Sequence, residues 1–111
     1  MDWQDIHKGK KVEGYWWSER KPQYPMPIPN VLTPEEAEEI YDLMVEKQNK
    51  AEIIHYFGMS TSRITGEMLG CEEYYTDEWI WTQDFGWHYV LKHLVRPSDE
   101  FLRYIGYIKT Q

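Results

Sequence analysis

Four residues in two short segments have the spacing of a four-ligand zinc site, although two of them are poor zinc ligands. The first segment contains Ser62 and Thr65, and the second contains His88 and His93. With cysteine at positions 62 and 65 the pattern would read C-x2-C followed by H-x4-H, which is typical of structural zinc sites. Serine and threonine hydroxyls are neutral and bind Zn²⁺ weakly. We therefore expect these four residues to meet in space as the remnant of a metal site, without a metal.

Two interpretations of this group remain open. Without metal, Ser62 and Thr65 would accept hydrogen bonds from the amides of a tight turn, and the two histidines would donate to nearby carbonyl or hydroxyl oxygens. A retained zinc ion would need a substitute ligand, for which Cys71 is the first candidate and His55 and Glu72 are others. We predict the metal-free arrangement and no cofactor, and zinc is the less favoured alternative.

The sequence gives little support for a catalytic role of the same residues. Ser62, His88 and Asp84 could be drawn as a triad, and Cys71 with either histidine as a thiol dyad. However, no nucleophile-elbow motif surrounds Ser62, and the sequence contains neither a P-loop nor a dinucleotide-binding fingerprint. We therefore predict that the protein is not an enzyme and has no catalytic residues.

Aromatic residues are abundant, with six Trp and nine Tyr among 111 residues. Each large ring can bury roughly 150–250 Å² of surface, so we expect most of them to form the core of a small domain. Alternatively, some rings could stack against a flat, nucleotide-like ligand while Arg63 or Arg20 meets a phosphate. The candidate binding surface consists of Trp16, Trp17, Arg63, Trp79, Trp81 and Trp87.

The chain is acidic, with 19 acidic and 12 basic residues and a formal net charge of −7. A nucleic-acid-binding protein normally carries the opposite sign, because the neutralisation of phosphates provides most of its affinity. The charge therefore argues against direct nucleic-acid or membrane binding and favours a protein partner with a basic surface, unless it serves only solubility. The single cysteine and the lack of a signal peptide or a long apolar run predict a cytoplasmic protein.

The sequence predicts a single domain over residues 14–111, whose helices and strands position these residues. A flexible N-terminal arm, residues 1–13, is predicted to precede it. Thr33, Pro34 and Glu36 combine a helix cap, a first-turn proline and a capping-box glutamate, which predicts a helix to about Asn49. Residues 53–57 predict a strand, and residues 74–76 and 79–82 predict an antiparallel hairpin.

Two further helices are predicted near the C-terminus. One covers residues 87–94, and the other begins after Ser98 as its N-cap. The expected fold is thus a small α+β domain with a capped N-terminal helix, a short antiparallel hairpin sheet, two C-terminal helices and a zinc-finger-like knuckle at residues 62–66.

Several short motifs occur in an order that resembles a family of small bacterial and phage proteins. These motifs are G-Y-W-W-S-E at residues 14–19, Y-F-G-M-S-T-S-R-I-T-G at 56–66, L-G-C at 69–71, Y-T-D at 75–77, Trp81, H-Y-V-L-K-H at 88–93 and the segment 95–101. Members of that family carry the zinc-finger-like pattern C-R-x-C-G…H-Y-V-x-x-H, and here Ser62 and Thr65 occupy both cysteine positions. The resemblance, over roughly residues 14–105, implies a fold and a lost metal but no established activity.

The sequence therefore favours a small, acidic, non-enzymatic binding protein that contacts another protein through exposed aromatic and acidic side chains. A phage-encoded or toxin-linked inhibitor fits this description. One alternative is an aromatic-pocket protein that binds or sequesters a nucleotide-like ligand. The other is a zinc-binding structural module, which would require Cys71 to join His88 and His93. The sequence does not decide the oligomeric state.

Overall fold

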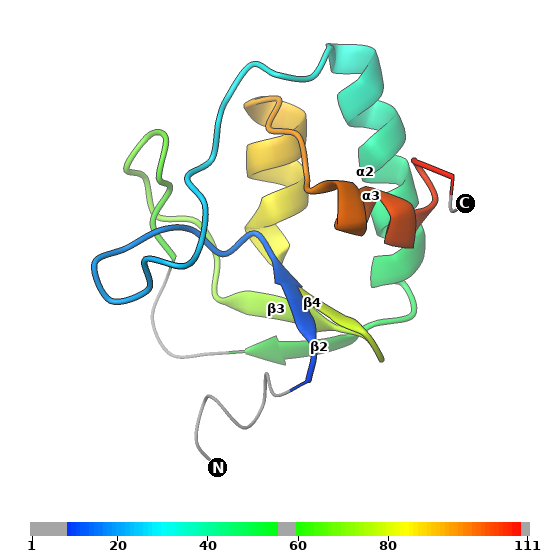
Figure 1. Ribbon diagram of the computed structural model, residues 1–111, viewed down its shortest axis with the longest axis horizontal. Helices are drawn as coiled ribbons and strands as arrows, with labels where there is room; N and C mark the ends of the chain where they lie inside the picture. Colours follow the sequence, from blue (N-terminus) through cyan, green and yellow to red (C-terminus); the bar gives the residue numbers. More distant parts are fainter. Residues whose placement is uncertain (1–8, 56–59, 110–111) are drawn as a thin grey trace.

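A four-stranded mixed sheet lies against three helices in the computed structural model, which describes residues 9–55 and 60–109 (Figure 1). The strands are β1 (Lys11–Glu13), β2 (Glu52–His55), β3 (Glu72–Tyr75) and β4 (Trp79–Thr82), in the spatial order β1-β4-β3-β2. The helices are α2 (Pro34–Gln48), η1 (Phe85–Lys92) and α3 (Asp99–Ile105), and they gather on one side of the sheet. The predicted α+β class is confirmed.

The sheet is more than the expected antiparallel hairpin. Strands β2, β3 and β4 are antiparallel neighbours, but β1 adds to β4 in parallel, with Val12 opposite Ile80. The prediction of an N-terminal arm is therefore wrong for Lys11–Glu13, while residues 1–8 lie outside the described residues. A three-residue strand with one apolar side chain carries too weak a pattern for sequence reasoning, and its partner is distant in the chain. The C-terminal end of the predicted strand 53–57 also lies outside the described residues.

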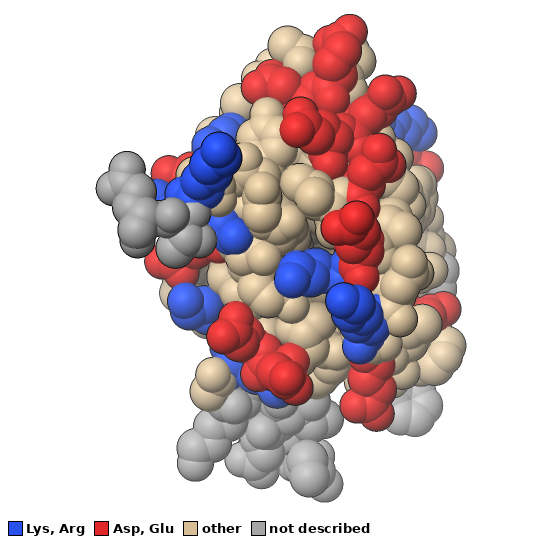
Figure 2. Space-filling view, turned by 90° about the vertical axis from the view of Figure 1, so that its right-hand side faces the viewer, with Lys and Arg blue, Asp and Glu red and all other residues tan. Residues whose placement is uncertain are grey.

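Helix α2 begins as the sequence predicts. The amide of Glu36 donates to Oγ1 of Thr33 at 3.1 Å, and the amide of Thr33 donates to Oε1 of Glu36 at 2.9 Å, which completes a capping box. Ala37, Ile40 and Met44 form its buried stripe. Acidic side chains occupy its exposed positions, and Figure 2 shows them gathered in a column on this side of the molecule. These exposed residues are Glu35, Glu38, Glu39, Asp42 and Glu46.

Helix η1 departs from the predicted α-helix over residues 87–94. It begins at Phe85 and is a π-helix, in which the amide of His93 donates to the carbonyl of His88 at 3.1 Å. Residues five apart span about 1.4 turns of an α-helix and point to different sides. The wider turn of the π-helix instead places them close to the same side, and such wide turns are frequent at functional sites. The helix type therefore decides how the two histidines meet.

Aromatic rings fill the centre between the sheet and the helices. Trp79 and Trp81 are 4% and 0% exposed, and both make edge-on contacts with Phe101 of α3. Gly86 lets η1 approach α2 closely, because a Cβ there would lie 2.9 Å from the ring of Tyr41. None of the helices within residues 9–55 and 60–109 is long and apolar enough to cross a membrane.

Candidate functional site

Residues 60–70 form a closed loop, the knuckle, whose two ends are paired. The amide of Ser60 donates to the carbonyl of Gly70 at 2.9 Å, and the amide of Leu69 donates to the carbonyl of Ser60 at 2.8 Å. At the tip, Oγ of Ser62 accepts hydrogen bonds from the amides of Ile64 and Thr65, at 3.1 and 3.0 Å. This local turn holds the Ser62 side chain on the inner side of the knuckle, where it is 4% exposed.

The knuckle is attached to η1 through two side chains of that helix. Nε2 of His88 lies 2.8 Å from Oγ of Ser62, and the phenol oxygen of Tyr89 accepts a hydrogen bond from the amide of Arg63 at 3.0 Å. Both His88 and Tyr89 are buried, at 0% and 2% exposure. The knuckle and η1 are therefore joined by two hydrogen-bond contacts, although they are separate in the sequence.

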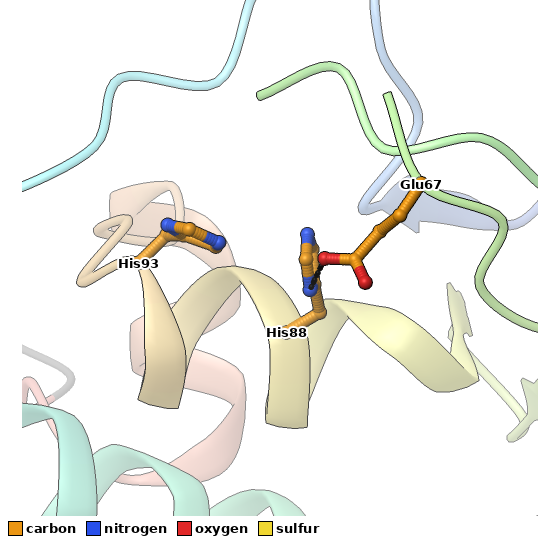
Figure 3. A group of neighbouring side chains, drawn as sticks. All are labelled: Glu67, His88 and His93. Atoms are coloured by element: carbon orange, nitrogen blue, oxygen red, sulfur yellow. Dashed lines mark ion pairs between the residues drawn. The ribbon is translucent and has the colours of Figure 1, made fainter. Parts of the chain in front are cut away.

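A group of three potential metal ligands lies on the histidine side of the knuckle (Figure 3). The side chains of Glu67 and His93 both approach His88, and one ligand atom from each residue lies within 4.8 Å of the others. Oε1 of Glu67 is 3.7 Å from Nδ1 of His88, and the two imidazole centres are 4.7 Å apart. Nδ1 of His88 and Nε2 of His93 are buried and have no hydrogen-bond partner among the described residues.

The charge state of His88 suits metal binding. Burial lowers the pKa of His88 below its ordinary value, and the neighbouring His93 lowers it further, so the imidazole is neutral at pH 7. A neutral imidazole is the form that binds a metal. Nζ of Lys92 lies 3.8 Å from Oε1 of Glu67 and competes for the same carboxylate.

The structure brings the four residues of the predicted remnant site together, and it adds one that the sequence did not reveal. Ser62 contacts His88 directly, whereas Thr65 reaches the group through Glu67, because its hydroxyl donates to Oε1 of Glu67 at 3.0 Å. Cys71 does not belong to the ligand group within the described part of the chain. Glu67 was missed because it lies outside the C-x2-C spacing; its only signal is a carboxylate in the same tight turn.

A pocket of about 350 Å³ opens beside the knuckle. Backbone or side chains of the knuckle, the sheet, η1 and the segment after β1 surround it. Its lining residues are Gly14, Tyr15, Trp16, Ser60, Thr61, Arg63, Glu73, Thr82, Asp84 and Tyr89. Three knuckle residues therefore line the pocket, whereas His88 and His93 do not. The part of the knuckle beside the pocket is called its pocket side, and the part that contacts His88 is called its histidine side.

Two buried carboxyl groups, those of Glu73 and Asp84, face this pocket at 4% and 3% exposure. Burial raises the pKa of Glu73 to about 7, and the negative charge of Asp84 contributes to the rise. Oδ2 of Asp84 accepts a hydrogen bond from Ser60 at 2.5 Å. Near neutral pH the carboxyl of Glu73 is therefore partly protonated, and in its protonated form it can donate a hydrogen bond.

Of the six residues predicted to form a binding surface, only Trp16 and Arg63 meet at the pocket. The ring of Trp16 packs 5.0 Å from that of Tyr89, and its buried Nε1 has no hydrogen-bond partner among the described residues. Trp79 and Trp81 belong to the core, so their assignment to a binding surface is wrong. Both lie on β4, whose four residues are all buried. Trp17 and Trp87 are 43% and 42% exposed but do not line the pocket.

The arrangement around Ser62 is not that of a nucleophile. Its oxygen already accepts two amide hydrogen bonds, and its side chain is buried. Asp84, the third member of the drawn triad, hydrogen-bonds Ser60 instead of serving as an orienting base for His88. Ser62 thus orients the imidazole of His88.

Comparison of the chain with protein-family models, curated proteins and solved structures found no match. The resemblance described from the sequence motifs therefore stays a prediction.

Proposed function

We propose that this chain is a non-enzymatic binding protein, and that its ligand is a small, flat, nucleotide-like molecule held in the pocket beside the knuckle. The observation that carries the proposal is the convergence of an indole, a guanidinium and two buried carboxyls on one pocket of about 350 Å³. Pockets that are mostly apolar with a few converging polar groups and a perturbed pKa are typical ligand sites.

The carboxyl pair gives the pocket its chemical preference. With its pKa near 7, Glu73 can donate a hydrogen bond in its protonated form while Asp84 accepts one. A donor beside an acceptor complements the edge of a purine or pyrimidine base. Arg63 lies exposed at the same pocket, where its guanidinium would meet a phosphate group. The unpaired Nε1 of Trp16 offers a further donor.

Binding fits this pocket better than turnover. Among its described lining residues there is no histidine or cysteine, and the Ser60 hydroxyl hydrogen-bonds the carboxylate of Asp84 and not a histidine. We place the protein in the cytoplasm, because its single cysteine suits a reducing compartment.

Calorimetric titration with a panel of nucleosides and nucleotides tests the proposal. Arg63→Gln should weaken the binding of a phosphorylated ligand by about tenfold or more and leave the corresponding nucleoside unaffected. Arg20→Gln is the matched control, because Arg20 is an exposed arginine that does not line the pocket. Absence of binding across the panel, or an equal effect of both variants, would contradict the proposal.

A second candidate function is suggested by the acidic face of α2. This helix carries five exposed carboxylates, and acidic side chains gather in a column on this side of the molecule (Figure 2), which would complement a basic protein surface. A pull-down at low and high salt tests this candidate. Retention of a partner should fall at high salt and in the charge-reversed variant Glu38→Lys/Asp42→Lys, and salt-independent retention would argue against electrostatic docking.

A further inference from the structure

We propose that Glu67, His88 and His93 form a binding site for one divalent transition-metal ion of the Zn²⁺ type. The ligand atoms would be Oε1 of Glu67, Nδ1 of His88 and Nε2 of His93. This set differs from the one that the C-x2-C…H-x4-H spacing suggests, because Glu67 supplies the anionic ligand and neither hydroxyl does. Cys71 takes no part, so the site does not depend on a relocated thiolate.

The first argument is the state of the two imidazoles. Nδ1 of His88 and Nε2 of His93 are both buried, and neither has a hydrogen-bond partner among the described residues. Buried polar atoms are nearly always paired, so two unpaired nitrogens on neighbouring rings require an explanation. The carboxylate of Glu67 does not supply one, because 3.7 Å is too long for a hydrogen bond to Nδ1. A single metal ion would satisfy both nitrogens at once.

The second argument is the geometry of the group. Bonds of about 2.0–2.2 Å in a tetrahedral site place the ligand atoms about 3.3–3.6 Å apart. One potential ligand atom of each residue lies within 4.8 Å of the other two, so modest side-chain rotations would close the site. The π-helix brings the two histidines to one side of η1. The Glu67 side chain is exposed, and it can rotate toward them if it exchanges its contacts with Thr65 and Lys92 for the metal ion.

Ser62 acts as a positioning residue for this site. A metal-bound histidine usually donates its other ring N–H to an oxygen, which fixes the orientation of the ring. Nε2 of His88 lies 2.8 Å from Oγ of Ser62, and the Ser62 hydroxyl also lies beside the phenol of Tyr89. When Nδ1 binds a metal, the serine proton can turn toward Tyr89, and Nε2–H can donate to Oγ of Ser62 in exchange for one of its two hydrogen bonds from the turn amides.

The ligand chemistry selects the class of ion. Two imidazoles and one carboxylate suit Zn²⁺, Co²⁺ or Ni²⁺, whereas Mg²⁺ and Ca²⁺ require mainly oxygen ligands. The ammonium group of Lys92, 3.8 Å from Glu67, repels the ion and competes for the carboxylate. Removing this charge in Lys92→Gln should therefore tighten metal binding.

Titration of the untagged, chelator-stripped full chain with ZnCl₂, followed by calorimetry, tests the site. We expect one ion per chain. His93→Gln and Glu67→Gln should each weaken binding by about tenfold or more. Neither variant disturbs a fully buried side chain, so both should fold. His55→Gln removes an exposed histidine on β2 and is the matched control, and Cys71→Ser tests the thiolate.

The outcomes are distinct. Binding of one Zn²⁺ that is weakened in His93→Gln and Glu67→Gln, unchanged in His55→Gln and Cys71→Ser, and tightened in Lys92→Gln supports the site. The proposal is overturned by the absence of saturable binding, by binding that His93→Gln and Glu67→Gln leave unchanged, or by loss in Cys71→Ser or His55→Gln. A Co²⁺ spectrum that shows thiolate charge-transfer bands would likewise overturn it.

Discussion

The two sides of the knuckle, residues 60–70, both bury polar side chains, but they differ in how the cost of that burial is compensated. On the pocket side, the carboxyls of Glu73 and Asp84 are buried, and a raised pKa lets one of them keep its proton. On the histidine side, the imidazole of His88 is buried and neutral, and two ring nitrogens find no hydrogen-bond partner within residues 9–55 and 60–109. Proton uptake relieves the carboxyls, whereas the proposed metal ion would relieve both histidine nitrogens. We therefore expect the pocket side to respond to pH and the histidine side to respond to metal.

The largest effect is expected from the pocket side, in Glu73→Gln. The pKa of Glu73 is about 7 in the folded chain against an ordinary 4.5, so the folded state favours the protonated form. The contribution of Glu73 to the free energy of unfolding is therefore fully present below about pH 4.5, where the group is protonated in both states. It is lost as the pH rises through 7, because the folded state must then bury a charged carboxylate. At pH 8 the glutamine variant should exceed the wild type by about 3 kcal/mol, since one pKa unit corresponds to about 1.4 kcal/mol.

Urea unfolding at pH 5 and pH 8 measures this difference. The gain of Glu73→Gln should shrink strongly at pH 5, where wild-type Glu73 is itself protonated in the folded state. Glu38→Gln, at an exposed position of α2, serves as the control and should change stability little at either pH. A Glu73→Gln variant that is less stable than wild type at pH 8 would show that the charged carboxylate is compensated.

The connection between the two sides is tested by Ser62→Ala. The change removes an acceptor for the amides of Ile64 and Thr65 and the hydrogen bond to His88, so it leaves buried polar groups unpaired. We expect a loss of about 2–3 kcal/mol in the free energy of unfolding. Thr65→Ala is the control, because its exposed hydroxyl bonds only within the turn and should cost about 1 kcal/mol or less. Equal losses in the two variants would mean that Ser62 does not hold the knuckle to η1.

Much of the fold could be predicted because its signals are local. The Thr33 capping box, the Ser98 cap and the apolar stripe of α2 each depend on residues within a few positions of one another. The meeting of Ser62 with His88 was also predicted, from ligand spacing. Strand β1 was not, because its parallel partner β4 is distant in the chain and a parallel pair needs no turn signal.

The candidate sites were harder to predict than the fold, for a physical reason. Helix η1 packs against α2 and hydrogen-bonds the knuckle, and no residue pattern distinguishes its π-helical form from an α-helix over residues 85–92. The pocket gathers Trp16, Arg63 and Glu73 from three separate segments of the chain. Trp79 and Trp81 fill the core instead, and nothing in the sequence alone separates them from Trp16. Residue type predicted which side chains could bind a ligand, and only the fold decides which of them meet.

The smallest change in stability, with a large change in binding, is expected for Trp16→Phe. The indole N–H is buried without a partner among the described residues, so phenylalanine removes an unsatisfied donor while it gives up part of the ring contact with Tyr89. These effects oppose each other, and the free energy of unfolding should change by less than about 1 kcal/mol. Loss of the N–H donor and of stacking area should nevertheless weaken a nucleotide-like ligand by about tenfold, as measured by calorimetry. Trp17→Phe, at an exposed position away from the pocket, should change neither quantity. If Trp16→Phe instead destabilises the fold strongly and leaves ligand binding intact, Trp16 serves only the core, as Trp79 and Trp81 of β4 do. The pocket would then not be the binding site.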